Sequence, residues 1–450
     1  MESKMNPPSD LTRLDLESLW HPMTQHRGIE SRMPRQIASA EGAFLTDTNG
    51  QRLLDGVSGL WCVNVGYGRE ELADVAREQM AKLSYLPGTF THGPAARLAS
   101  KLIEMLGYKG KAYFTNSGSE ANEAAFKVAR QYHAQTGAPS RYKIIARYRG
   151  YHGNTLGALS ATGQAERKFG YGPLAPGFVH IEAPDSYRVD RDCAAILDRT
   201  IAHEGSDTVA AFIMEPIIAG GGVLLPPEDY LRNVRKVCDR HGVLLILDEV
   251  VTAFGRIGAA FAHQLYGVEP DILTLGKGIA SGYQPLAAMV AKQHIFEAFE
   301  GDADDLRHFR HINTYGGHPV ATAVALRNIE IMEREGLFER AAKTGDALLT
   351  RLRCLEDHPN VGDVRGRGLL LGIELIEDKD EKTPLSQASV GAVVGRCARD
   401  GVIIGRTTNS TPGFGNVLIL APPLVLSDDE ADQLASTIEG AIREELEPGT

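Results

Sequence analysis

Apolar and polar positions follow two different patterns along this chain. Between residues 40 and 56, two short apolar runs flank Asn49-Gly50, a dipeptide typical of tight hairpin turns. From about residue 70, short apolar or β-branched runs alternate with longer amphipathic segments. This alternation predicts strands and helices in turn, and hence a mostly parallel sheet covered by helices on both faces.

Short apolar runs predict the strands of this sheet, at 111–116, 142–148, 209–216, 243–250 and 271–277. Segments 119–134 and 228–242 predict helices between them, and Gly242 closes the second because glycine readily takes the left-handed backbone of a helix end. We therefore expect an α/β domain in this part of the chain.

After about residue 330 the pattern indicates a separate α+β unit. A helix over roughly 318–335 leads into it, strands follow at 369–376 and 402–406, and 427–446 predicts a closing helix capped by Ser427. We expect the N-terminal hairpin to join this unit. The predicted division is an arm and part of the small domain over 1–70, a large domain over 71–329 and a C-terminal small domain over 330–450.

Composition narrows the class of protein. A length of 450 residues suits one large and one smaller domain, and a net charge of -11 argues against nucleic-acid binding. The five cysteines are scattered without a C-x-x-C pair, which fits a reducing compartment and argues against a disulfide scaffold or a structural zinc site. The N-terminus lacks the apolar core of a signal peptide, and no apolar run has the length of a membrane span, so we expect a cytoplasmic protein.

Ligands of open α/β sheets bind beyond the carboxyl ends of the strands, so the residues that follow each strand are the candidates for a site. Ser117, Gly118 and Ser119 follow the first strand and open a helix. Small residues there expose backbone N–H groups to a phosphate. The same residues would also serve as an ordinary helix cap.

Three further strand ends carry candidate chemistry. Tyr151 follows 142–148 and would stack on a flat ring, although a core tyrosine has the same surroundings. Asp248 ends a buried strand and needs a partner, which is either a protonated pyridine nitrogen or a protein group. Lys277 lies between glycines at a strand end, where a buried amine would form a Schiff base; a lysine that reaches solvent is the alternative.

The combination is more specific than its parts. Asp248 and Lys277 are 29 residues apart (277 − 248), which leaves room for one crossover helix between parallel strands. A phosphate site, a stacking aromatic, a carboxylate and a lysine at strand ends together indicate a pyridoxal-phosphate pocket. The chain has no G-x-x-x-x-G-K-[ST], H-E-x-x-H or G-x-S-x-G motif, which argues against the enzyme classes that use them.

Several stretches resemble the class III aminotransferases, pyridoxal-phosphate enzymes of fold type I. They are FTNSGSEAN, RGYHG, EPI, LLILDEVVTAFGR, LTLGKGIASG and INTYGGHP, within a resemblance over roughly 20–445. It implies an α/β fold with a mostly parallel, seven-stranded sheet between helices in the large, cofactor-binding domain. A small α+β domain would form from both chain ends.

The resemblance also implies a role for each candidate residue. Lys277 would hold pyridoxal phosphate as a Schiff base and carry the proton in a ping-pong reaction between an amine donor and a keto acid. The other implied contacts are the pyridine nitrogen for Asp248, the two ring faces for Val250 and Tyr151, the phosphate for Ser117, Gly118 and Ser119, and the substrate side for Glu215. Thr314 would reach the phosphate of a neighbouring subunit, which implies a homodimer or an assembly of dimers.

Within the family, the chain most resembles the ω-amino-acid:pyruvate branch, and there the taurine:pyruvate aminotransferases. Trp61 resembles an aromatic residue of the substrate pocket, with core packing as its alternative. Arg406 would bind a sulfonate or carboxylate, with solvent exposure as its alternative. Taurine with pyruvate is the favoured pair, and hypotaurine, β-alanine, other ω-amino acids and diamines stay open as donors. An aminomutase, a decarboxylating enzyme and a non-catalytic binding protein are the competing classes.

Overall fold

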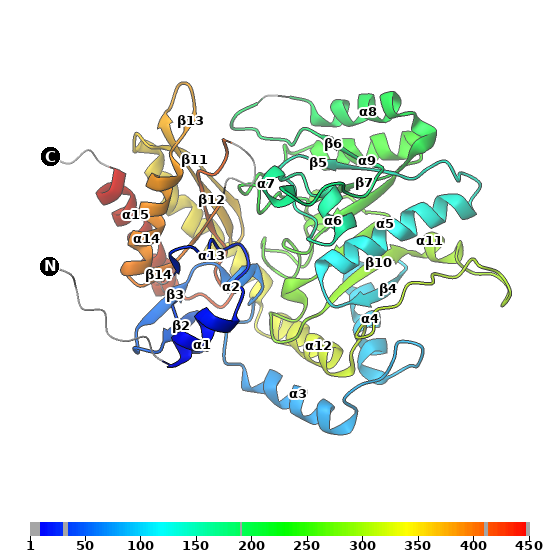
Figure 1. Cartoon of the computed structure of the whole chain (residues 1–450), viewed down its shortest axis with the longest axis horizontal. Helices are drawn as coiled ribbons and strands as arrows, with labels where there is room; N and C mark the ends of the chain where they lie inside the picture. The colour runs from blue at the N-terminus through cyan, green and yellow to red at the C-terminus, as the bar shows by residue number, and fades with distance from the viewer. Residues whose placement is uncertain (1–9, 30–34, 190, 409–412, 447–450) are drawn as a thin grey trace.

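The computed structural model describes residues 10–29, 35–189, 191–408 and 413–446, which form three β-sheets surrounded by helices. In Figure 1, the large sheet and its helices occupy one side of the molecule, and the strands and helices from the two chain ends gather on the other. None of the described helices is long and apolar enough to cross a membrane.

The large sheet has seven strands in the order β4-β10-β9-β8-β7-β5-β6. Their bounds are Gly110–Thr115 (β4), Lys143–Arg147 (β5), Phe178–Ile181 (β6), Val209–Met214 (β7), Leu244–Asp248 (β8), Ile272–Leu275 (β9) and Ala287–Lys292 (β10). Strand β10 is antiparallel to both neighbours, and the strands from β9 to β6 are parallel. The predicted, mostly parallel sheet is therefore confirmed.

Helices cover both faces of this sheet, as its continuous apolar strands require. In β8, Leu245 and Leu247 pack into one apolar core and Ile246 into another, which is the alternation expected of a strand. Helix α9 (Tyr230–His241) contributes to the first core and helix α5 (Gly118–Gln135) to the second. The two helices thus lie on opposite faces of the sheet, at positions that the sequence predicts.

The remaining helices connect the strands or pack around the two smaller sheets. They are Asp10–Ser18 (α1), Ser58–Trp61 (α2), Glu70–Lys82 (α3), Gly93–Leu106 (α4), Leu156–Ala161 (α6), Ala165–Lys168 (α7), Cys193–Glu204 (α8), Ala262–Tyr266 (α10), Gln293–Glu297 (α11), Pro319–Arg334 (α12), Leu337–Leu352 (α13), Gln387–Arg399 (α14) and Asp428–Leu446 (α15). Ser427 caps α15 as predicted: its Oγ accepts from the N–H of Glu430 at 3.2 Å, and its own N–H donates to that side chain.

The two smaller sheets combine strands from both chain ends. One has the order β1-β2-β3-β14, and the other has β11-β12-β16-β15 with β13 beside β12. Their bounds are Ile37–Glu41 (β1), Phe44–Asp47 (β2), Arg52–Asp55 (β3), Val361–Arg367 (β11), Leu370–Asp378 (β12), Thr383–Pro384 (β13), Val402–Ile403 (β14), Gly405–Arg406 (β15) and Val417–Leu420 (β16). The predicted hairpin is the β2–β3 pair, joined across Asn49-Gly50. The division at residues 70 and 330 stays a prediction, with which the β3–β14 pairing is consistent.

One predicted strand is wrong. The run 402–406 divides into β14, which pairs with β3, and β15, which pairs with β16 in another sheet. The chain changes partners because the N–H of Gly56 donates to the Ile403 carbonyl, whereas the N–H of Thr407 donates to Val417. A run of five residues is too short for its pattern to indicate such a change of partner.

Candidate active site

A pocket of about 440 Å³ opens at the carboxyl ends of the parallel strands. The residues that follow β4, β5, β7, β8 and β9 all contribute to its walls. The predicted site residues that line it are Trp61, Ser117, Gly118, Ser119, Tyr151, Glu215, Asp248, Val250 and Lys277. The fold therefore brings together residues that lie up to 216 positions apart (277 − 61).

Asp248 is a buried carboxylate held by two neighbouring side chains. His152 Nδ1 and Asn122 Nδ2 lie 2.9 and 2.8 Å from its Oδ2, and the N–H of Val250 donates to Oδ1 at 3.1 Å. Asn122 is itself oriented by the hydroxyl of Thr274, 2.9 Å from its Oδ1. The carboxylate is therefore fixed in direction at the pocket wall, where it suits a cationic partner.

Lys277 begins a short 3-10 helix just after β9, in a left-handed conformation with φ 43°. Burial lowers the pKa of its amine, while the charges of Asp248 and Glu215 act in the opposite direction. Its Nζ lies 5.8 Å from the ring centroid of Trp61. A lowered pKa leaves more of the amine neutral, and the neutral amine is the form that attacks a carbonyl carbon.

The segment Ser117–Ser119 forms the N-terminus of α5. Ser117 Oγ accepts from the N–H of Glu120 at 3.3 Å, and Ser119 Oγ donates to Asn154 Oδ1 at 3.0 Å. A Cβ on Gly118 would lie 2.9 Å from Val250 Cγ2, which is too close for a side chain. Glycine therefore lets Val250 pack closely here, and the start of this 18-residue helix lines the pocket, where a helix N-terminus suits a phosphate.

Tyr151 and Val250 are half-buried in the pocket wall, where an aromatic and a branched side chain suit the two faces of a flat ring. The guanidinium of Arg167 lies over the Tyr151 ring, 4.8 Å from its centroid. Glu215 accepts from the N–H of Tyr151 at 3.0 Å and from that of Ala219 at 3.1 Å. Burial, with a further contribution from Asp248, raises the pKa of Glu215.

Two predicted site residues do not line this pocket. Thr314 is exposed, and its carbonyl accepts from the hydroxyl of Tyr85 at 3.0 Å. Arg406 is half-buried against α14, where its Nη1 donates to the Gln387 carbonyl at 3.0 Å. The structure thus places Arg406 with a helix of its own chain, and its role toward a substrate stays a prediction.

His152 and Asn122 are the residues that the sequence reasoning did not assign. Both lie within segments in which the sequence predicts other site residues, namely RGYHG and FTNSGSEAN. Periodicity gives no sign that their side chains turn toward Asp248. The available signal is chemical: a buried carboxylate requires donors, and polar residues next to neighbouring strand ends are the nearest candidates.

Comparisons with known proteins decide the family. The sequence profile described as Aminotransferase class-III matches residues 27–442. The chain belongs to the class III aminotransferases. It is 51% identical to an uncharacterized aminotransferase, YhxA, of Bacillus subtilis, over 95% of this chain and 96% of that one. It is 42% identical to the taurine–pyruvate aminotransferase of Bilophila wadsworthia, over 96% and 97% of the two chains.

A solved structure extends the comparison to the fold and the cofactor. The ω-transaminase of Pseudomonas jessenii, in complex with PMP, superimposes with a TM-score of 0.92 at 34% identity, over 97% of this chain and 98% of that one. The class III aminotransferase described here thus has the fold type I architecture and depends on pyridoxal phosphate. Its pocket fits that cofactor, because a fixed carboxylate, a helix N-terminus and a half-buried lysine face one cavity.

Proposed function

We propose that this aminotransferase moves the amino group of an ω-amino acid, with taurine as the favoured donor, to pyruvate. The observation that carries the proposal is the pocket shared by the amine of Lys277 and the carboxylate of Asp248, which lie at the ends of the neighbouring strands β9 and β8. Pyridoxal phosphate, when bound, supplies an electron sink for the negative charge that deprotonation leaves on the donor carbon.

Each residue of the pocket has a separate role in this proposal. With the cofactor bound, Lys277 Nζ would take and hold the proton of the donor carbon, for which a neutral amine is required. Asp248, whose carboxylate is fixed by His152 and Asn122, would pair with the pyridine nitrogen. The start of α5 and the hydroxyls of Ser117 and Ser119 would hold the phosphate. Tyr151 and Val250 would enclose the ring from its two faces.

The surroundings of Lys277 include an apolar wall that suits the methylene groups of an ω-amino acid. Trp61 lies 5.8 Å from Lys277 Nζ, and Leu60 extends the same apolar wall. The methylene groups of an ω-amino acid would lie against this wall, while its charged group, farther from the amine, would lie outside it.

A cation beside the pocket supports an anionic group at the other end of the donor. The guanidinium of Arg167 lies against the Tyr151 ring and donates to Gln164 Oε1 at 2.8 Å. Arginine binds sulfonates and carboxylates through paired N–H groups. This favours taurine and β-alanine over diamines, whose second ammonium group would be repelled.

The donor is tested by a half-reaction without acceptor. We expect taurine to bleach the visible absorbance of the enzyme-bound cofactor, and β-alanine to do so more slowly. Pyruvate should then restore the absorbance and yield one alanine for each donor consumed. Bleaching by a diamine such as putrescine and not by taurine would contradict the proposed donor. Product without alanine would instead indicate a mutase or a decarboxylating enzyme.

We also propose that two copies of the chain complete each site. Residues around Thr314 present large apolar side chains to solvent, namely Tyr85, Phe90, Ile312 and Tyr315, which are 41–70% exposed. Such a patch favours burial against another protein surface. A second copy of this chain would bury it and would carry the partner's Thr314 toward the phosphate.

Hybrid dimers test this sharing of the site. Lys277→Ala removes the lysine, and Thr314→Glu adds a negative charge that repels the phosphate, so each parent protein is expected to be nearly inactive. If Thr314 serves the partner's site, a mixed dimer contains one intact site and regains up to about half of the activity per hybrid dimer. No recovery in mixtures that light scattering shows to be dimeric would overturn the proposal.

A further inference from the structure

The turn 219–223 follows Glu215 and forms part of the pocket wall through Gly220. A Cβ on Gly220 would lie 3.5 Å from the Trp61 ring, so the turn lies close beside that ring. The turn ends on Val223, a fully buried residue with φ 51°. A β-branched residue adopts this left-handed conformation only where its surroundings impose it.

Two arginines from distant parts of the chain hold the carbonyls of this turn. Arg149, which follows β5, donates to the Gly221 carbonyl through Nε at 3.0 Å and Nη2 at 2.7 Å. Arg365, in β11, donates to the Gly222 carbonyl through Nη2 at 2.6 Å and to the Val223 carbonyl through Nε at 2.9 Å. Three consecutive carbonyls thus accept from buried guanidinium groups, which fixes the direction of the turn.

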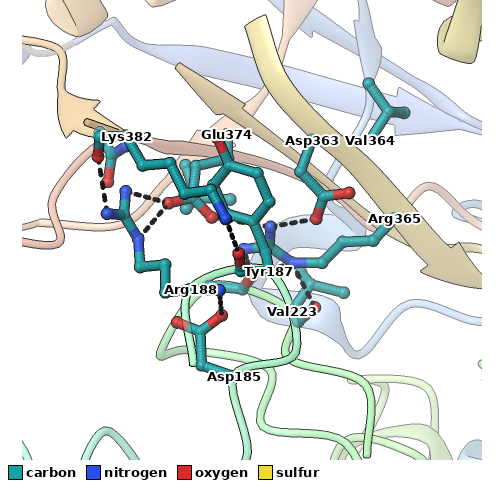
Figure 2. Close-up of polar contacts among 12 residues, drawn as sticks. Asp185, Tyr187, Arg188, Val223, Asp363, Val364, Arg365, Glu374 and Lys382 are labelled. Atoms are coloured by element: carbon teal, nitrogen blue, oxygen red, sulfur yellow. Dashed lines mark hydrogen bonds and ion pairs between the residues drawn. The ribbon is translucent and has the colours of Figure 1, made fainter. Parts of the chain in front are cut away.

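The arginines are in turn fixed by carboxylates. Arg365 Nη1 lies 2.6 Å from Asp363 and 2.7 Å from Glu374, and Arg188 Nε donates to Glu374 at 2.8 Å. Figure 2 shows this network, in which Arg188 and Arg365 approach Glu374 from two sides and Arg365 continues to Val223. Arg149 forms an ion pair with Asp185. Three guanidinium groups therefore face three carboxylates.

Burial within this network is deep enough to make it rigid. The side chain of Glu374 is fully buried, and those of Arg188 and Arg365 are 13% and 11% exposed. Burial alone would raise the pKa of Glu374, but the two guanidinium groups outweigh it and hold the pKa below its usual value. The carboxylate stays charged, and it keeps Arg365 aimed at the turn.

From these contacts we infer that Arg365 is a positioning residue for the substrate wall: it places Gly220 against Trp61 and so sets the size of the donor that the pocket accepts. The inference rests on the proposed donor pocket. Arg365 and Glu374 lie on β11 and β12, outside the large sheet. The shape of the substrate wall is therefore coupled to the placement of the C-terminal sheet.

The test compares Arg365→Met with Arg188→Met in the holoenzyme. Both changes break an ion pair to Glu374, but only Arg365 contacts the turn. We expect Arg365→Met to speed hydrogen exchange of the peptide 217–226 and to change the ratio of kcat/KM for a linear and a branched ω-amine by about tenfold or more. Arg188→Met should leave both readouts within about twofold of wild type, even where its Tm falls equally.

Equal changes in the two variants, or a lower Tm alone, would overturn the inference. Arg365→Lys serves where the methionine variant does not fold, because lysine keeps the charge and has three donors in place of five. For Arg365→Lys, the hydrogen-exchange rate of 217–226 and the ratio of kcat/KM for the two amines should lie between those of wild type and Arg365→Met. Wild-type values for both would also overturn the inference. If wild type itself accepts no ω-amine while exchange responds as expected, the proposed donor class fails and the positioning role stands.

Discussion

Lys277→Ala is expected to lower aminotransferase activity by at least about 10⁴-fold, because the nucleophile and the proton carrier are lost together. The purified variant should lack the visible absorbance of covalently held pyridoxal phosphate. Lys292→Ala is the matched control, since Lys292 ends the neighbouring strand β10 and pairs with Glu269. That control should keep the colour and the activity, and an active Lys277→Ala protein would refute the central assignment.

The thermal stability of Lys277→Ala shows whether its loss of activity comes from lost chemistry or from a misfolded protein. The folded-state pKa of Lys277 is lowered from its ordinary 10.5, so its contribution to stability is present above pH 10.5 and is lost as the pH falls through the lowered value. Near neutral pH the buried amine therefore favours unfolding of the cofactor-free protein. We expect cofactor-free Lys277→Ala to melt no lower than cofactor-free wild type at pH 7, as measured by calorimetry.

Asp248→Asn is expected to lower kcat by about 10²–10³-fold, because a neutral amide cannot keep the pyridine nitrogen protonated. The phosphate contacts and Lys277 remain, so the variant should still bind pyridoxal phosphate. Asp198→Asn is the control, since Asp198 pairs with Arg240 and His241 at the surface. Wild-type kcat in Asp248→Asn would contradict the assigned pair.

The pH dependence gives a second readout for Asp248. Its charge raises the pKa of Lys277, against the larger lowering by burial. Removal of the charge should lower that pKa further, so the amine stays neutral to lower pH. The rate of cofactor binding falls at acidic pH as Lys277 is protonated, and in Asp248→Asn this fall should occur at lower pH than in wild type. Stopped-flow absorbance measures the rate.

Local patterns predicted the elements that position the site. The run 243–250 corresponds to β8, and the segment after 111–116 corresponds to the start of α5. Both could be predicted because the spacing of apolar residues and the residues that start a helix are signals that extend over only a few positions. The convergence of Asp248 and Lys277 also follows from sequence, since parallel strands end at the same edge of a sheet. The family resemblance extended these expectations to pyridoxal phosphate.

Other features depend on contacts that no local pattern encodes. Residue type and the family resemblance of its segment assign Arg406 to the substrate, whereas the structure joins it to the Gln387 carbonyl. The carbonyls that Arg365 holds lie 142 and 143 positions away in the chain. A sequence pattern gives the charge of such a residue, but its partner is set by the tertiary packing.

The pairing of β3 with β14 has a consequence for the order of folding during synthesis. Leu54 faces Val402 in this pairing, so the two strands leave the ribosome 348 residues apart (402 − 54). At a translation rate of about 5–20 residues per second, the edge of β3 stays without its partner for roughly 17–70 seconds. An open strand edge attracts other chains, and the nascent N-terminal hairpin is therefore a natural client for a chaperone until the last tenth of the protein arrives.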